Sequence, residues 1–169
     1  HPLDRWSRHV GDTLAQAYGG LALYPFTGPP EQPGYHPFQQ WAARSEPVHT
    51  SPLMLRIHPQ HGLWHAYRFA LVFPTLEPVD RDALRAPVQA ESPCLSCADQ
   101  PCLTACPVDA FDSQAFAVQR CRTHLHSPAG TPCMENGCQA RKACPVAADL
   151  RYAPAQTAFH TAAFARARL

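Results

Sequence analysis

The sequence predicts an α+β fold, in which a small mixed α/β part at the N-terminus precedes a cysteine-rich part. Two patterns lead to this prediction. Apolar residues recur at helical spacing near the N-terminus and alternate as in a strand near residue 55. All 8 cysteines lie between Cys94 and Cys144, so packing alone must hold the N-terminal part together. We expect this part to span 1–90, the cysteine-rich module 91–152, and a C-terminal helix 153–169.

The first element expected is an amphipathic helix over residues 3–18. Its apolar side chains recur at steps of three or four residues and form one stripe, which consists of Leu3, Trp6, Val10, Leu14 and Tyr18. Gly19 and Gly20 follow the stripe, and glycine commonly ends a helix. The stripe is therefore expected to be the face that packs on the core.

A strand, a loop and a second helix are expected next. The apolar run 21–26 has the length of a buried strand. Residues 27–37 carry four prolines and two glycines, which favours a loop. Residues 38–45 form a short helix in this interpretation.

A β-hairpin and a linker complete the N-terminal part. Leu53, Leu55 and Ile57 alternate with polar or flexible residues, the turn-prone segment 58–62 follows, and a second apolar run covers 63–73. The two runs are expected to pair as a hairpin. The proline-rich segment 74–93 then reads as a surface linker.

Composition and charge exclude two classes of partner. The net charge is +1 and no Lys/Arg block occurs, so neither a nucleic-acid partner nor a polybasic membrane anchor is expected. The longest apolar stretch, 66–73, is interrupted by Arg68 and is far shorter than the roughly 18 to 20 residues of a membrane span. We therefore expect a soluble protein. The chain starts at His1 rather than Met, so we also expect a segment upstream of it.

The cysteines form two groups with short spacings, and a proline follows the last cysteine of each group. The first group has the spacing C-x2-C-x4-C-x3-C-P and consists of Cys94, Cys97, Cys102 and Cys106. The second has the spacing C-x11-C-x4-C-x5-C-P and consists of Cys121, Cys133, Cys138 and Cys144. A cubane cluster needs three thiolates from one loop and a fourth from elsewhere, which such groups supply. Eight cysteines therefore complete two [4Fe-4S] clusters.

The ligands are expected to cross between the groups. In ferredoxins with two clusters, the cysteine before proline in one run binds the cluster of the other run. Under this rule the first cluster is held by Cys94, Cys97, Cys102 and Cys144. The second cluster is held by Cys106, Cys121, Cys133 and Cys138.

Two other uses of the cysteines are less favoured. A disulfide framework is typical of shorter secreted chains. Two zinc sites with four cysteines each are the stronger alternative, because Cys94 and Cys97 have a zinc-knuckle spacing. Zinc sites usually combine two such pairs, however, and the chain has one.

The motifs also resemble those of known families. The segment from Cys94 to Pro107 resembles the first cluster motif of dicluster ferredoxins, including the iron-sulfur subunits of molybdenum oxidoreductases. The isolated Cys121 and the segment 51–73 resemble the ferredoxin module of epoxyqueuosine reductase and the hairpin before it and, more distantly, the module of reductive dehalogenases. The resemblance covers about residues 51–150. It implies a ferredoxin-like module that feeds electrons to a cobalamin in an α/β domain.

The function expected is one-electron transfer through two [4Fe-4S] clusters, with a redox partner protein or a bound redox cofactor. The alternative is an oxidoreductase, a corrinoid- or flavin-dependent reductase whose clusters feed that cofactor. A third possibility is that the clusters are purely structural. No catalytic residue is assigned. Free thiols and clusters are typical of a reducing cytoplasm.

A few aromatic and histidine residues have secondary interpretations. His124 is placed to donate a hydrogen bond to a cluster sulfur, which would raise the reduction potential. If a flavin or corrin binds, it would bind at the segment 35–41 and at the hairpin residues Trp64, Tyr67 and Phe69. Core packing is the favoured explanation of these aromatic residues. The other histidines lack a metal-binding spacing and are expected to be structural or exposed.

Overall fold

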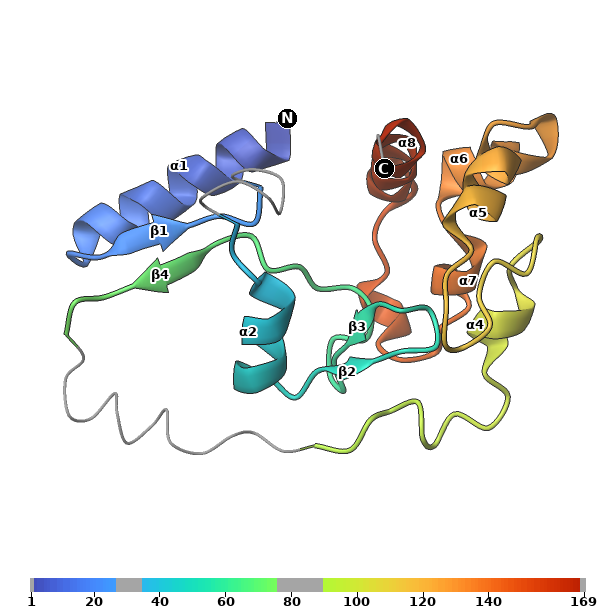
Figure 1. Ribbon diagram of the computed structural model, residues 1–169, viewed down its shortest axis with the longest axis horizontal. Coiled ribbons are helices and arrows are strands. Elements are labelled where there is room, and N and C mark those ends of the chain that lie inside the picture. The colour runs from blue at the N-terminus through green and yellow to red at the C-terminus, as the bar shows by residue number, and fades with distance from the viewer. Residues whose placement is uncertain (1, 27–34, 76–89, 168–169) are drawn as a thin grey trace. The chain divides into compact units, whose positions relative to one another are not determined.

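The computed structural model describes the residues 2–26, 35–75 and 90–167. Helices and short strands both occur, as an α+β chain requires (Figure 1). The chain divides into two compact units, of which the first is His1–Pro47 with Ala66–Gln89 and the second is Val48–His65 with Ala90–Leu169. This division differs from the single boundary expected near residue 90. Residues 48–65 belong with the cysteines because their apolar side chains pack there.

In the described residues of the first unit, two helices accompany a two-stranded sheet. Its elements are α1 (Pro2–Ala17), β1 (Leu21–Leu23), α2 (Phe38–Ser45) and β4 (Ala70–Val72). The strands are antiparallel, with Leu21 opposite Val72 and Leu23 opposite Ala70. The two expected helices are confirmed, α2 at its predicted bounds.

The buried face of α1 is not the predicted apolar stripe. The residues of α1 that are buried are Ser7, Gly11 and Ala15, whereas Trp6 and Tyr18 are 59% and 70% exposed. The other three residues of the stripe are partly buried. Small side chains at every fourth position allow the helix to approach the sheet closely. A Cβ at Gly11 would lie 2.6 Å from the Tyr24 hydroxyl oxygen.

Tyr24 fixes α1 against the end of β1, and its substitution gives a testable effect. Its hydroxyl donates to Asp12 Oδ1 at 2.6 Å and also lies 3.0 Å from the Arg8 carbonyl oxygen. Burial, followed by the Asp12 carboxylate, raises the pKa of Tyr24 from 10.0 to about 12. A raised pKa means that this stabilisation is complete below pH 10 and is lost as the pH rises through about 12.

We expect Tyr24→Phe to lower the free energy of unfolding by about 1 to 2 kcal/mol near neutral pH. The difference from the wild type should shrink above pH 10. Denaturant unfolding over a pH series measures both effects, and a difference that stays constant across the series would contradict this account.

The second unit holds all eight cysteines, on short helices and in the loops beside them. Its strands are β2 (His49–Thr50) and β3 (Arg56–Ile57). Its helices are α4 (Pro101–Thr104), α5 (Val118–Leu125), η1 (Pro128–Gly130), α6 (Thr131–Asn136), α7 (Gln139–Lys142), η2 (Ala148–Leu150) and α8 (Pro154–Arg166). The predicted C-terminal helix is confirmed as α8. It packs on α6, where the Thr157 hydroxyl donates to the Asn136 carbonyl oxygen at 3.0 Å.

The predicted hairpin is wrong beyond its turn. The turn is present, because the N–H groups of His58 and Gly62 each donate to the other residue's carbonyl oxygen at 2.9 and 2.8 Å. Beyond the turn, β3 pairs with β2 and β4 pairs with β1, so the second apolar run leaves the second unit after His65 and continues in the first unit from Ala66. A tight loop makes the first pairing possible, since Met54 has a φ of 58°.

Two predicted segments lie largely outside the described residues: the loop over 27–37 and the linker over 74–93. Among the helices that the structure describes, none combines the length and apolar character needed to cross a membrane.

Candidate metal centre

The eight cysteine thiols line two cavities, four thiols in each. The first cavity is lined by Cys94, Cys97, Cys102 and Cys144. The second is lined by Cys106, Cys121, Cys133 and Cys138. None of the eight is in a disulfide. These are the two sets that the crossed assignment predicts, and the structure brings the members of each set together. That each set binds a cluster stays a prediction.

Two short helices explain how the sets cross. Cys102 lies within α4 and Cys106 lies just after its end, so one turn of chain separates a thiol of the first cavity from a thiol of the second. Cys138 and Cys144 flank α7 in the same way. The helices α4 and α7 pack against each other, with Ala140 of α7 fully buried. Each helix therefore connects both cavities.

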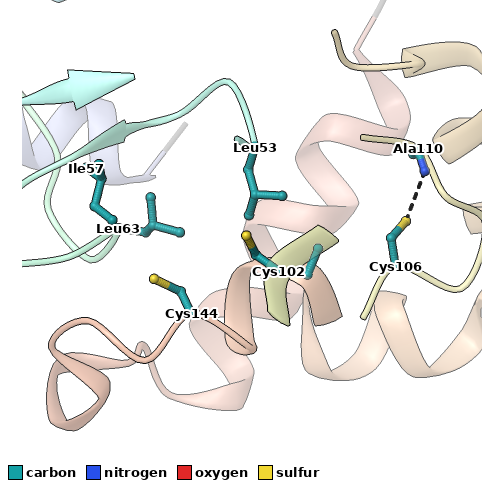
Figure 2. Packing of buried hydrophobic residues seen from close by; sticks show 8 residues of the cluster. Leu53, Ile57, Leu63, Cys102, Cys106, Ala110 and Cys144 are labelled. Atoms are coloured by element: carbon teal, nitrogen blue, oxygen red, sulfur yellow. Dashed lines mark hydrogen bonds between the residues drawn. The ribbon is translucent and has the colours of Figure 1, made fainter. Parts of the chain in front are cut away.

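The first cavity is small and is closed by the segment that contains β2 and β3. Its volume is about 20 Å³. Leu53, Ile57 and Leu63 line it and are only 1% to 3% exposed. In Figure 2 the sulfurs of Cys102 and Cys144 point toward these side chains, whereas the sulfur of Cys106 points away from them. Apolar closure of this kind limits the access of water to Cys102 and Cys144, which are buried, whereas Cys94 and Cys97 are partly exposed.

The second cavity is larger, about 300 Å³, and two nitrogen atoms lie near its sulfurs. The Ala110 N–H donates to Cys106 Sγ at 3.3 Å, a bond also drawn in Figure 2. His124 Nε2 lies 3.9 Å from Cys133 Sγ. The structure therefore places His124 beside the Cys133 sulfur, and its hydrogen bond to a cluster sulfur stays a prediction.

Burial disfavours the thiolate form of several of these cysteines. Burial, and then the neighbouring thiols of its own set, raise the pKa of Cys121 from 9.0 to about 11. Burial is also the first cause of the raised pKa values of Cys94, Cys102 and Cys138. Metal ligation requires thiolates. A positively charged metal group would offset both the burial and the mutual repulsion, and its binding would release protons.

The donor sets fit a cubane cluster. Each cavity offers four thiols and no described carboxylate. Ser51 adds a side chain that is 4% exposed, lines the first cavity and has a hydroxyl with no partner among the described residues. A cluster sulfur would accept that hydroxyl hydrogen bond. Four thiols spread around a cavity also suit a cubane, because each thiolate binds a different iron.

A single zinc ion with four thiolate ligands needs a tighter arrangement of sulfurs than a cubane cluster does. Among the residues that the structure describes, no three His, Cys, Asp or Glu side chains converge as ligands of one metal ion. Tetrahedral zinc, with Zn–S bonds of about 2.3 Å, brings its thiolates to about 3.8 Å from one another.

The aromatic residues expected near a flavin or corrin are divided between the units. In the first unit, His36, Phe38 and Trp41 form one ring cluster, and Phe69 packs on the core that contains Tyr24. In the second unit, Trp64 is buried in the wall of the second cavity.

One feature of the site had no signal in the sequence. The guanidinium of Arg141, on α7, packs against the rings of both Trp64 and Tyr152, at 4.8 and 4.9 Å from their centroids. It also donates to the Leu63 carbonyl oxygen. Arg141 therefore ties α7 to the segment that closes the first cavity. A cation packed on two rings depends on tertiary contacts that no local spacing encodes.

Comparison with known proteins gives no relative for this arrangement: no family model, curated protein or solved structure matches the chain.

Proposed function

We propose that the chain is an iron-sulfur electron-transfer protein whose second unit is a ferredoxin-like module carrying two [4Fe-4S] clusters. The observation that carries the proposal is the grouping of eight free thiols into two sets of four, each of which combines both cysteine groups of the sequence. The redox partner is a second protein or a bound redox cofactor. A reducing compartment such as the cytoplasm suits eight free thiols.

The chain's own residues have defined roles in this proposal. A [4Fe-4S] cluster, when bound, accepts and releases one electron at a potential set by its surroundings. Leu53, Ile57 and Leu63 cover one side of the first thiol set, in which Cys102 and Cys144 are buried. The Ala110 N–H stabilises negative charge on the Cys106 sulfur.

The two helices at the crossing support transfer between the sets. Cys102 and Cys106 are four residues apart at α4, and Cys138 and Cys144 flank α7. Each helix thus gives a short covalent connection from one thiol set to the other. A chain with this connection is suited to passing electrons singly along the pair.

The experiment that tests the proposal is analysis of iron, acid-labile sulfide and zinc in anaerobically purified protein, with absorption spectra before and after dithionite. We expect about eight iron and eight sulfide per chain and bleaching on reduction. Zinc without sulfide or visible colour would refute the proposal. A corrin or flavin band in the same spectrum would instead favour a reductase.

Ser51 provides a second test, which measures the reduction potential of a cluster rather than the iron and sulfide content. Its hydroxyl, in the first cavity, is placed to donate to a cluster sulfur. Such a bond stabilises the reduced state, so Ser51→Ala should lower the reduction potential of one cluster and leave the other unchanged. Redox titration followed by electron paramagnetic resonance measures both potentials.

Ser96 is the matched control for Ser51. It directly precedes Cys97 of the first set, but it is exposed and its hydroxyl donates to the Pro93 carbonyl oxygen. Ser96→Ala should leave both potentials unchanged. Equal potentials in Ser51→Ala and the wild type would show that the Ser51 hydroxyl does not reach a cluster.

A further inference from the structure

Two buried N–H groups at the second thiol set have no acceptor among the described residues. Trp64 lines the second cavity and is only 6% exposed, and its Nε1–H is buried without a partner. Arg141 lines the same cavity, and its Nε–H is also buried without a partner, although its guanidinium donates to the Leu63 carbonyl oxygen. A buried donor without an acceptor is costly and calls for an explanation, such as a role in binding or redox chemistry.

Tertiary contacts hold both donors in place. The Arg141 guanidinium packs against the rings of Trp64 and Tyr152, at 4.8 and 4.9 Å from their centroids. The two rings meet edge to face, with centroids 5.5 Å apart and planes inclined by 70°. Planar groups packed in this way lose little freedom when they donate a hydrogen bond, because their orientation is already fixed.

A cluster in the second cavity would supply acceptors for these donors. The thiols of the cavity are those of Cys106, Cys121, Cys133 and Cys138. They bind iron as thiolates, and a [4Fe-4S] cluster adds sulfides, so both kinds of sulfur can accept hydrogen bonds. The reduced cluster carries one more negative charge than the oxidised cluster. N–H donation to its sulfurs therefore favours reduction.

The surroundings of the two thiol sets also differ in charge. The described lining of the second cavity includes the cations Arg141 and Lys142 and no carboxylate. The described lining of the first cavity includes no Asp, Glu, Lys or Arg, and its unpartnered donor is the uncharged hydroxyl of Ser51. Positive charge near a cluster stabilises the added electron and raises the reduction potential. Charge and N–H donors thus both favour reduction at the second set.

We propose that the second thiol set holds the cluster of higher reduction potential, and that Trp64 and Arg141 are the residues that raise it. The inference rests on the proposed function, in which each set binds a [4Fe-4S] cluster. One electron then passes from the reduced first cluster, which is oxidised, to the second cluster, which is reduced. The module therefore receives electrons at the first set and delivers them to its redox partner from the second.

Redox titration of the anaerobically purified wild type, followed by electron paramagnetic resonance, tests the order of the potentials. We expect two one-electron steps at different potentials. The Cys106→Ala, Cys121→Ala double variant lacks two thiols of the second set and should keep only the first cluster. We expect this cluster to titrate near the lower of the two potentials of the wild type.

Trp64→Phe tests the indole N–H on its own. The variant keeps a ring for Arg141 and removes the donor, so the higher potential should fall and the lower potential should stay unchanged. Tyr152→Phe is the matched control. Tyr152 also packs on Arg141 but is not among the described residues that line either cavity, so both potentials should stay unchanged.

Lys142→Gln is a second variant, and it does not disturb a buried ring. Lys142 is partly exposed and lines the second cavity, so removal of its charge should also lower the higher potential alone. Thermal unfolding of the three single variants shows whether each remains folded.

The inference is overturned if the first set holds the higher potential, if the two potentials are equal, or if Trp64→Phe shifts them no more than Tyr152→Phe. Iron and sulfide analysis of the same preparations separates these outcomes from failure of the proposed function. Protein with about eight iron per chain and any of these three results retains the electron-transfer proposal and loses the order of potentials. Protein without iron or sulfide would refute the proposed function, and the order of potentials with it.

Discussion

The Cys106→Ala, Cys121→Ala double variant should retain about four iron per chain, whereas the Cys94→Ala, Cys106→Ala double variant should retain none. The reason is the arrangement of the thiols. Cys106 and Cys121 line the same cavity, so the first pair of substitutions removes one cluster. Cys94 lines the other cavity, so the second pair removes both.

This comparison separates crossed from uncrossed ligation, which single variants do not. If each sequence group held its own cluster, Cys94 and Cys106 would share one, and that double variant would keep about four iron. The Cys106→Ala, Cys121→Ala variant would then lose both clusters. Iron and sulfide analysis after anaerobic reconstitution gives the answer, and the uncrossed pattern would refute the ligand sets.

Gly62→Ala, in the turn over residues 58–62, should strongly destabilise the second unit. Gly62 has a φ of +56°, and a Cβ there would overlap the Val146 carbonyl oxygen. Val146 follows Cys144 and Pro145 and lines the first cavity. We expect a loss of about 3 kcal/mol or more in the free energy of unfolding, together with poor retention of the first cluster.

Gly19 provides the control for Gly62 because Gly19→Ala measures the cost of the positive φ alone, without a steric contact at the Cβ. Its φ is +67° and nothing lies within 4 Å of the Cβ position. Gly19→Ala should therefore cost only the conformational strain, about 1 to 2 kcal/mol. Denaturant unfolding measures both variants. Equal losses would show that the contact with Val146 contributes nothing.

Local patterns in the sequence predicted the helices better than their packing. The bounds of α2 and the start of α8 at Pro154 were predictable because an apolar pattern and a helix-initiating proline are local signals. The face that α1 buries was not predictable from apolar residues. The buried face of α1 is determined by the close approach of the sheet. Close approach favours small residues such as Ser7 and Gly11 at the contact.

The predicted strand pairing was wrong for a related reason. A turn at 58–62 exists, but a turn does not determine what its arms pair with afterwards. The arms separate because β4 pairs with β1, a partner far away in the sequence. Long-range pairing of this kind is set by the whole fold and leaves no local signal.

The candidate site was predictable to the extent that spacing determines it. The two thiol sets follow from two cysteine groups and one rule of crossing, and the structure groups the thiols in the same way. The unequal size of the cavities depends on contacts among distant residues. So does the packing of Arg141 on the rings of Trp64 and Tyr152. Sequence spacing contains no information on either.

The second unit is assembled from two separate stretches of chain, and this has a consequence for oxygen tolerance. A fragment that begins at Ala90 would contain every cysteine but would lack Leu53, Ile57 and Leu63, which close the first cavity. Dioxygen and solvent would then reach the first thiol set directly. The stretch 48–65, which carries no cysteine, thus covers one side of the proposed redox centre, whose first cysteine follows some 30 residues later.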